Sequence, residues 1–480
     1  MLLCPLLGSA QQWVIDFSDH EFASGIDDGV LADDGGVIAV GTIASDSLYY
    51  NPLLLHIQPD GNYSERACYD IPNFFSGYVV KLNNGNYMSF GWSTVDKESV
   101  GVLIFNDSFD IISTKMYEAD STVSNIAGGK AIVDDDGSVV VCGQYQPAKA
   151  SKRPFFYRFN EEGDTVCSRF VKPETNPWYY VWDFECYQIM KDPQSDGFIV
   201  INNGRNGPCA MAFYDRYFNE TECVVPMDYD GMPLYDYFGS DTWLSDDRML
   251  AFGHNISHEG QYLQLADINI DGSVNGYVNI LSTPDTSYNC GGNRCAAMVN
   301  DTTIYGLFYL YHDFKGFGTN VGACLFNKNM EVLGMRRFLD DEYRDLYPRS
   351  IIPLPDGGCM LLCFRYNANY DTDIFIIKMS REDLNPIPCG VKEIPQERLQ
   401  ALAFPNPTHG ELNIDISGIP ENTENRVSIT DMQGMVRISR IIRGNGNLLT
   451  IDASSLEAGT YVYSVFNSEK ELLKGKFVKE

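Results

Sequence analysis

The chain has 480 residues, with 65 acidic against 35 basic side chains and a formal net charge of −30. Its hydrophobic content of 44% is enough for large packed cores, which excludes a chain that is disordered throughout. A surface this acidic repels phosphate backbones and anionic lipids, so nucleic-acid binding is not expected. No run of 18 or more apolar residues follows the N-terminus, so no transmembrane segment is expected either.

The charge is divided unevenly along the chain. Residues 401–480 hold 8 Lys/Arg and 10 Asp/Glu, so −28 of the net charge belongs to residues 1–400. This difference in composition predicts two unlike domains.

The first ten residues, MLLCPLLGSA, combine a short apolar run with Gly8-Ser9-Ala10 before Gln11. Small residues after an apolar run are typical of a cleavage site for secretion. We interpret residues 1–10 as the remnant of an export signal, with a buried N-terminal strand as the alternative.

A local pattern recurs over the first 380 residues, in which an acidic or Gly turn precedes four to six β-favouring residues that often end in Gly. Its seven copies are marked by Gly35, Gly85, Gly137, Gly197, Asp247, Asn300 and Gly357, between 50 and 60 residues apart. Repetition at this period is the signature of a repeat architecture.

Each copy is followed by a second apolar hairpin. These hairpins span residues 53–65, 102–116, 154–171, 210–226, 262–280, 322–338 and 373–384. Two hairpins per copy give four strands in about 50 residues, which is the size of one propeller blade. We therefore predict an all-β chain whose residues 11–384 form a seven-bladed β-propeller, with an array of β-sandwiches as the alternative. The seventh copy lacks a fourth strand, and we expect residues 11–17 to supply it and close the ring.

The connectors between predicted blades pair aromatic with acidic side chains at the expected mouth of the central channel. Aromatic faces beside carboxylates commonly hold sugars or cationic peptides, although rings at these positions also pack between blades. The candidate ligand rim comprises Trp178, Tyr179, Trp182, Asp183, Tyr229, Tyr235, Tyr237, Tyr343 and Tyr347.

Other candidate sites are weaker. Residues 267–272 match the start of a calcium loop, but Val278 replaces its last ligand, and similar stretches in other copies favour a hairpin turn. His254 and His258 lie on a predicted loop, where a solvated loop is favoured over a metal site. We expect no metal and no cofactor.

Thirteen cysteines are many for a reduced cytoplasm, and an exported protein could oxidise some of them. Cys209 and Cys223 flank a predicted hairpin and could face each other across it. Cys290 and Cys295 bracket a Gly-Gly turn and form a second candidate pair.

No GxSxG, HExxH or phosphate-cradling Gly loop is present, and the abundance of carboxylates removes any specificity from a possible catalytic pair. The sequence therefore favours binding over catalysis, and assigns no catalytic residue.

After a predicted linker at residues 385–400, the last 80 residues read as short strands of a small antiparallel, immunoglobulin-like sandwich. Four motifs stand in order: FPNPTHGEL at 404–412, ITDMQG at 429–434, IDASSLEAGTY at 451–461 and KFVK at 476–479. Their residues suit turns and a small core. The motif positions are Pro405, Asn406, Pro407, Gly410, Asp431, Gly434, Leu456, Gly459, Tyr461, Lys476 and Val478.

In these motifs, residues 401–480 resemble the type A C-terminal sorting domains of the type IX (Por) secretion system. An ordinary immunoglobulin-like binding module is the alternative. The resemblance implies recognition by the secretion translocon and export through the periplasm across the outer membrane of Bacteroidetes-type bacteria. The expected location is extracellular or on the outer-membrane surface.

Together these expectations describe an exported propeller that recognises an extracellular glycan or peptide. A secreted hydrolase or lyase that acts on polysaccharide or peptide with carboxylates at the channel mouth is one alternative. An inert surface scaffold is another.

Overall fold

The computed structural model describes residues 13–17, 24–45, 50–71, 74–93, 99–118, 123–147, 152–171, 184–204, 209–227, 233–234, 237–257, 260–282, 287–290, 294–300, 302–311, 320–338, 345–366, 372–381, 383–384, 403–415, 424–431, 435–443, 448–467 and 470–480. All regular elements in these ranges are β-strands, and none of the described residues belongs to a helix with the length and hydropathy of a membrane span. The chain divides into two compact units, Met1–Ile387 and Pro388–Glu480.

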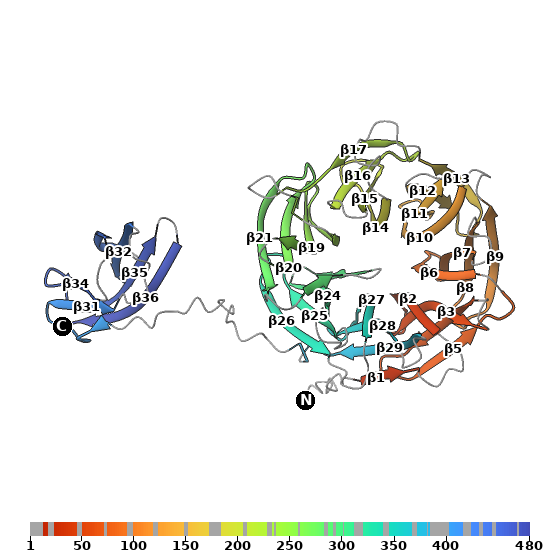
Figure 1. Ribbon diagram of the computed structural model, residues 1–480. Coiled ribbons are helices and arrows are strands. Elements are labelled where there is room, and N and C mark those ends of the chain that lie inside the picture. Colours follow the sequence, from red (N-terminus) through yellow and green to blue (C-terminus); the bar gives the residue numbers. More distant parts are fainter. Residues whose placement is uncertain are drawn as a thin grey trace, which may run out of the picture. The chain divides into compact units, whose positions relative to one another are not determined.

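The first unit is built of antiparallel sheets that surround a common centre (Figure 1). The first strand along the chain is the innermost one in each sheet except the last, where the N-terminal strand is outermost. We call each sheet a blade and number the blades along the chain. Blade 1 consists of β2 (Ser24–Leu31), β3 (Val37–Ala44), β4 (Tyr50–Ile57) and β5 (Tyr63–Ala67), and blade 2 of β6 (Phe74–Lys81), β7 (Tyr87–Ser93), β8 (Ser99–Phe105) and β9 (Ile111–Glu118). Blade 3 consists of β10 (Val123–Val133), β11 (Val139–Pro147), β12 (Arg153–Phe159) and β13 (Thr165–Phe170), and blade 4 of β14 (Phe184–Lys191), β15 (Phe198–Gly204), β16 (Cys209–Tyr214) and β17 (Glu220–Val224).

Three further sheets complete this unit within the described residues. Blade 5 consists of β18 (Tyr237–Ser245), β19 (Arg248–Ser257), β20 (Gly260–Asn269) and β21 (Val274–Ser282). Blade 6 consists of β22 (Ser287–Cys290), β23 (Ala296–Asn300), β24 (Thr303–Tyr311), β25 (Asn320–Phe326) and β26 (Val332–Phe338). Blade 7 consists of β27 (Asp345–Pro353), β28 (Cys359–Tyr366) and β29 (Thr372–Met379) together with β1 (Trp13–Asp16).

The ring is closed by the N-terminal strand. β1 runs antiparallel to β29, from Trp13 opposite Lys378 to Asp16 opposite Phe375. Arg365 of β28, which is fully buried, binds the Asp16 carboxylate at 2.6 Å and lies 3.7 Å from Asp373. The first and last strands of the unit therefore share one sheet and one buried ionic contact.

Two kinds of glycine explain the repeated sequence pattern. Gly35, Gly85, Gly137 and Gly357 occupy turns at φ between 82° and 86°, a backbone conformation that glycine adopts without the strain that an L side chain would cause. The glycine that ends the motif allows strands to approach closely, since a Cβ on Gly41 would lie 2.0 Å from the carbonyl oxygen of Gly25.

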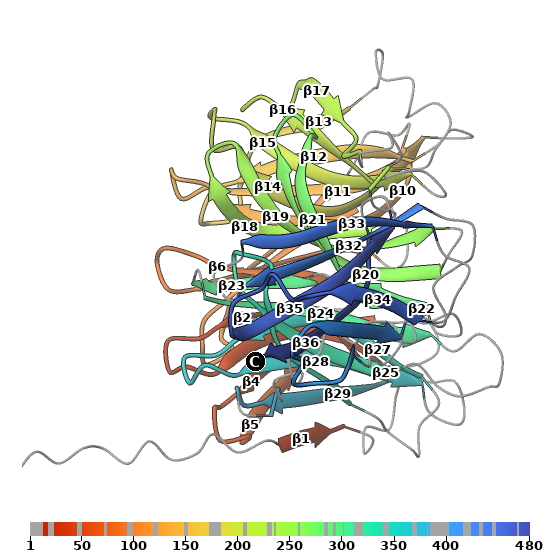
Figure 2. The same cartoon turned by 90° about the vertical axis from the view of Figure 1, so that its left-hand side faces the viewer.

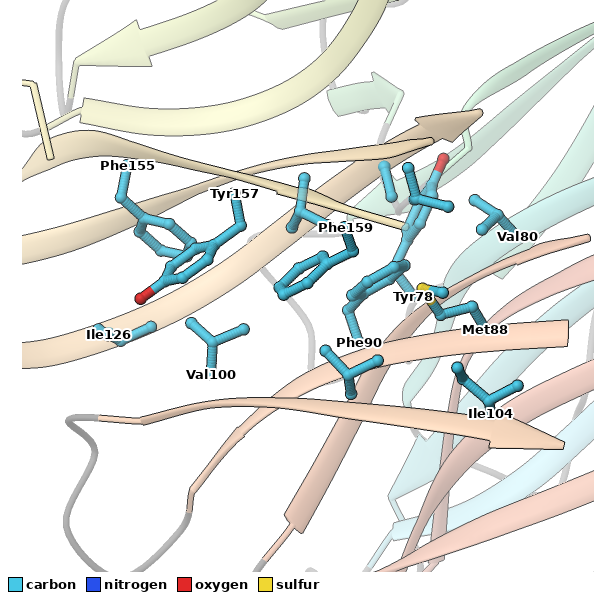
Figure 3. Packing of buried hydrophobic residues seen from close by; sticks show 14 of the residues in the cluster. Tyr78, Val80, Met88, Phe90, Val100, Ile104, Ile126, Phe155, Tyr157 and Phe159 are labelled. Carbon is cyan, nitrogen blue, oxygen red and sulfur yellow. The ribbon is translucent and has the colours of Figure 1, made fainter. Parts of the chain in front are cut away.

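Apolar side chains fill the spaces between neighbouring blades. Between blades 2 and 3, the rings of Phe90 and Phe159 stack with centroids 5.7 Å apart, and Tyr157 stacks on Phe159 (Figure 3). Burying one such aromatic side chain stabilises the fold by about 1.5–3 kcal/mol. The β-favouring runs of each copy thus form the inter-blade cores.

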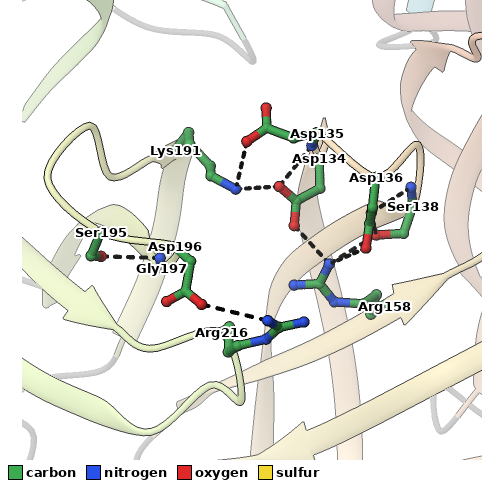
Figure 4. Close-up of polar contacts among 10 residues, drawn as sticks. All are labelled: Asp134, Asp135, Asp136, Ser138, Arg158, Lys191, Ser195, Asp196, Gly197 and Arg216. Atoms are coloured by element: carbon green, nitrogen blue, oxygen red, sulfur yellow. Dashed lines mark hydrogen bonds and ion pairs between the residues drawn. The ribbon is translucent and has the colours of Figure 1, made fainter.

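Charged side chains also join neighbouring blades. Asp134, in the turn after β10, accepts hydrogen bonds from Arg158 of its own blade at 2.6 Å and from Lys191 of blade 4 (Figure 4). Burial alone would raise the pKa of Asp134, but the bonds from Lys191 and Arg158 outweigh it and lower that pKa. Lys81 of β6 makes the corresponding contact to Asp33 of blade 1 at 2.5 Å.

The second unit contains two sheets. One has the order β30 (Ala403–Phe404), β31 (Glu411–Asp415), β34 (Leu448–Asp452), and the other has the order β33 (Val436–Arg443), β32 (Glu424–Asp431), β35 (Gly459–Asn467), β36 (Lys470–Lys479) (Figure 2). Their buried residues form one core, which includes Leu412, Val427, Tyr463 and Phe477. The predicted all-β fold, a propeller followed by a small antiparallel sandwich, is confirmed. The predicted linker at 385–400 and the export-signal remnant at 1–10 lie outside the described residues.

Candidate functional site

In the described part of the ring, the innermost strands break register against their neighbours. The breaks lie between Ile26 and Asp28 in β2, Ser76 and Tyr78 in β6, Ala127 and Lys130 in β10, Cys186 and Gln188 in β14, Gly239 and Thr242 in β18, and Pro348 and Ser350 in β27. In blade 6, β22 and β23 pair with β24 on either side of Arg294. A bulge bends its strand and re-aims a side chain, so these breaks direct residues that a regular strand would place elsewhere.

A buried carboxylate ties four blades together at these breaks. Asp28 of β2 is 0% exposed and accepts hydrogen bonds from Arg294 Nε at 3.1 Å, Ser350 Oγ at 2.8 Å and the Val79 backbone N–H at 3.2 Å. The backbone N–H of Arg294 donates to the Arg349 carbonyl at 3.3 Å. Asp28 therefore satisfies donors from blades 2, 6 and 7 at once.

The adjacent residue, Asp27, lies in the bulge itself. Its carboxylate is 3.7 Å from Arg349 Nε, and its side chain is 8% exposed. Burial raises the pKa of Asp27 to about 6, although Arg349 partly opposes this effect. Asp27 is therefore ionised at neutral pH and takes up a proton near pH 6.

The Asp27→Asn variant should gain stability relative to wild type as the pH rises. Because the folded-state pKa lies above the ordinary value of 3.8, stability from Asp27 is fully present below pH 3.8 and is lost as the pH rises through about 6. The difference in unfolding free energy between variant and wild type should shift by about 2 kcal/mol between pH 4.5 and 7.5. Urea denaturation at both pH values measures it.

The control is Asp107→Asn, because Asp107 lies in an exposed hairpin turn. It should show no such shift. An Asp27→Asn difference that is equal at both pH values would contradict the assigned burial effect.

Three cations gather around these carboxylates. The Arg294 guanidinium lies 4.7 Å from the centroid of the Tyr78 ring, and Lys130 Nζ lies 5.5 Å from the same centroid. Lys130 is 7% exposed, whereas the side chains of Arg294 and Arg349 are 29% and 38% exposed. We name Asp27, Asp28, Lys130, Arg294 and Arg349 the inner-strand cluster; its formal charge is +1, within a segment of net charge −28.

Aromatic rings adjoin the cluster on blade 7. The Arg349 guanidinium lies 4.7 Å from the centroid of Phe364, and Tyr347 stacks on the same ring at 5.3 Å. Tyr366 meets Phe364 edge-on at 5.6 Å, and Tyr309 of blade 6 lies 6.4 Å from Tyr347. Burial raises the pKa of Tyr309 to about 12, so its hydroxyl stays protonated. A half-buried aromatic surface thus borders an accessible guanidinium.

This arrangement locates only part of the predicted rim. Tyr347 contributes a ring to the aromatic surface, and Tyr237 opens β18, where its backbone pairs with His254. The other predicted rim residues, Trp178, Tyr179, Trp182, Asp183, Tyr229, Tyr235 and Tyr343, lie outside the described residues.

Sequence reasoning missed the inner-strand cluster. A usable signal was present, because Asp27-Asp28, Lys130 and Arg349 interrupt otherwise small or apolar strands just before the repeated turns. Charges that are buried within a strand require partners, and here Asp28 and Asp27 lie beside Arg294 and Arg349.

The weaker candidates have structural explanations. His254 was predicted on a loop, which is wrong: it lies in β19, where burial lowers its pKa to about 4 and its Nδ1 accepts the Cys290 N–H at 3.3 Å. The calcium-like stretch forms a hairpin turn, in which the Asn269 N–H donates to Ser273 O at 2.8 Å. Among the described residues, no group of three or more His, Cys, Asp or Glu side chains is placed to hold a metal ion. His258 lies outside them.

The cysteine pairs differ from each other in outcome. Cys223 lies opposite Ala212 in the β16–β17 ladder, not opposite Cys209, so the predicted facing pair is wrong. The thiol of Cys290, in contrast, is hydrogen-bonded to that of Cys295.

In the second unit, the first and last sequence motifs meet. The Asn406 Oδ1 accepts the Val478 N–H at 2.8 Å, and its Nδ2 donates to Lys476 O at 3.4 Å. The flanking Pro405 and Pro407 are exposed and follow cis peptide bonds. The opening motif is thereby attached to the last strand.

The two middle motifs complete this framework. Asp431 accepts bonds from the Met435 N–H at 2.9 Å and Arg437 Nε at 2.7 Å, while Gly434 lies outside the described residues. Tyr461 stacks on Phe477 at 5.6 Å. The remaining motif residues lie in the core or at strand ends: Leu456 is 9% exposed, the Gly410 carbonyl accepts the Ala453 N–H at 2.6 Å, and Gly459 pairs with Lys479.

Residues 402–480 match the family described as the secretion system C-terminal sorting domain. These residues are a sorting domain of that family. The sorting domain indicates that the protein is exported to the extracellular space or the cell surface, and it implies recognition by the secretion system. No curated protein matches the chain.

Several solved structures are similar to the chain. They include a fungal alcohol oxidase in complex with copper (10% identity, 98% of this chain and 100% of the other, TM-score 0.48) and the periplasmic gluconolactonase of Pseudomonas aeruginosa (10%, 87% and 98%, TM-score 0.46). A polysaccharide lyase described as an ulvan lyase also matches (9%, 78% and 99%, TM-score 0.43). At these identities and TM-scores the similarity carries no argument about activity.

Proposed function

We propose that this exported protein is a recognition module whose propeller binds an acidic extracellular glycan at the inner-strand cluster. The observation that carries the proposal is the convergence of Lys130, Arg294 and Arg349 from blades 3, 6 and 7. Each comes from a different part of the sequence, yet all lie beside Asp27 and Asp28.

Charge favours a ligand with few, spaced anionic groups. The surrounding segment carries −28 and repels dense polyanions at a distance, while the local cluster carries +1. Arg349 is 38% exposed, so its guanidinium has donors available to a carboxylate or sulfate. A short acidic oligosaccharide meets both conditions better than a highly sulfated polymer does.

The aromatic surface favours a sugar ring. Tyr347 and Phe364 present neighbouring faces beside Arg349, and apolar faces of sugars pack on such rings. The rim residues predicted from the sequence, Trp178, Tyr179, Trp182, Asp183, Tyr229, Tyr235, Tyr237 and Tyr343, are candidates for further contacts with the same glycan.

In a glycan array, the full-length protein should bind uronic-acid or sulfated oligosaccharides more tightly than their neutral counterparts. Arg349→Ala removes a charge-assisted hydrogen bond, so it should weaken binding of the best acidic ligand about 10- to 100-fold in isothermal titration calorimetry. Neutral ligands should be affected less.

Arg216→Ala is the matched control, because Arg216 is half exposed in a hairpin turn of blade 4 and pairs only loosely with Asp196, at 3.6 Å (Figure 4). It should leave binding unchanged. Equal binding of acidic and neutral glycans, selective binding of peptides instead, or conversion of the bound oligosaccharide to shorter products would overturn the proposal, the last in favour of a hydrolase or lyase.

A further inference from the structure

We propose that Cys290 and Cys295 form a disulfide in the exported protein, and that this bond closes the six-residue segment that carries Arg294. The bond itself does not depend on the proposed function. Its effect on ligand binding rests on that function.

The ladder of blade 6 brings the two cysteines together. Cys290 lies opposite Phe308 at the end of β22, and the carbonyl of Cys295 accepts the N–H of Leu307 at 2.7 Å, just before β23 begins. Their backbones thus lie beside neighbouring positions of β24, although four residues separate them in the sequence, and both side chains belong to one buried core with Phe308. Their thiols are already hydrogen-bonded to each other.

The surroundings hold both sulfur atoms in place. Cys290 is 2% exposed and Cys295 is 4% exposed. A Cβ on Gly239 of β18 would lie 2.5 Å from Cys295 Sγ, so the sulfur lies directly against the backbone of blade 5. His254 contacts Cys290 from the neighbouring strand β19, with its Nδ1 3.5 Å from the sulfur.

Export supplies the oxidising conditions. The sorting domain indicates export, and the periplasm through which such cargo passes is an oxidising compartment. The two thiols lose two protons and two electrons as the S–S bond forms. The electrons reduce the disulfide of a periplasmic protein thiol oxidant to its dithiol. Because both sulfurs are buried in the folded protein, oxidation precedes the completion of folding.

The bond has a defined consequence for the cluster. Arg294 immediately precedes Cys295 and forms a parallel β-bridge with Ser350 of β27. Both Arg294 and Ser350 donate hydrogen bonds to the Asp28 carboxylate. Fixing the ends of the segment limits the conformations open to Arg294 before a ligand arrives. Such preorganisation reduces the ordering that binding requires.

Tryptic mapping tests the bond directly, because cleavage after Arg294 separates the two cysteines. Protein collected from the cell surface or medium is alkylated without reduction and digested. We expect peptide 249–294 to remain linked to peptide 295–315, and the two to separate on reduction. Alkylated thiols at both positions, or a link between 249–294 and the Cys209 peptide 206–216, would overturn the proposal.

A second measurement separates this inference from the proposed function. The Cys290→Ala/Cys295→Ala variant should bind the best acidic oligosaccharide about 3- to 10-fold more weakly than wild type, and Cys68→Ala should bind as wild type does. If the peptides are linked but no acidic glycan binds, the disulfide stands and the proposed function fails. If the acidic glycan binds but the two thiols are free, the proposed function stands and the disulfide proposal fails.

Discussion

Replacing Arg365 by alanine should lower the free energy of unfolding of the propeller by about 3–5 kcal/mol. The fully buried guanidinium neutralises two carboxylates, Asp16 at 2.6 Å and Asp373 at 3.7 Å, and it lies 5.2 Å from the Phe375 ring. Alanine would leave Asp373 buried without this cation and would remove the side-chain contact that supports the β1–β29 ladder. Chemical denaturation of the full-length protein measures the loss.

Graded variants identify the cause. Asp16→Asn should cost less than Arg365→Ala, because Asp16 is 37% exposed and its loss leaves Arg365 beside Asp373. The control Arg216→Ala removes an exposed pair with Asp196 at 3.6 Å and should change stability by less than about 1 kcal/mol. If Arg365→Ala were no more destabilising than Arg216→Ala, the buried pair would not hold the ring closed.

Removal of residues 401–480 should abolish surface display and leave the propeller in the periplasm. The export signal is assigned to the sorting domain, and the described residues of its core, such as Leu412 and Phe477, come from the second unit itself. The truncated propeller should therefore fold but remain inside the outer membrane. Cell fractionation and protease accessibility on intact cells measure its location.

A point variant tests the same assignment without truncation. Phe477 is fully buried and stacks on Tyr461, so Phe477→Ala should destabilise the sorting domain by about 3–5 kcal/mol and reduce display. Val478→Ala, at a side chain that is 38% exposed, should leave display intact. Normal display of the truncated protein would refute the sorting assignment.

Local sequence patterns were sufficient to predict the propeller. Gly35 and its counterparts mark turns that need positive φ, and the apolar runs after them supply the blade cores. The missing fourth strand of the last copy predicted the pairing of the N-terminal segment, which the β1–β29 ladder shows. Each of these features is encoded within a short stretch of sequence, so it can be recognised without knowing which distant residues become contacts.

The inner-strand cluster depends instead on contacts that no local pattern encodes. Asp28 and Arg294 are 266 positions apart in the sequence, and Ser350 lies 322 positions from Asp28. They meet only because the ring brings the first blade beside the last two, and because bulges re-aim their side chains. A single sequence shows charges within strands but does not show which charges become partners.

The pairing of β1 with β29 means that the ring can close only late in the synthesis of this chain. The ribosome makes β1 first, but the partner of β1 is complete only at Met379, and the sorting domain follows from residue 402. Every chain that carries the complete sorting domain thus already contains all the strands of its ring. A chain whose synthesis stops before residue 402 lacks the sorting domain, so the secretion system would not recognise an incomplete propeller for export.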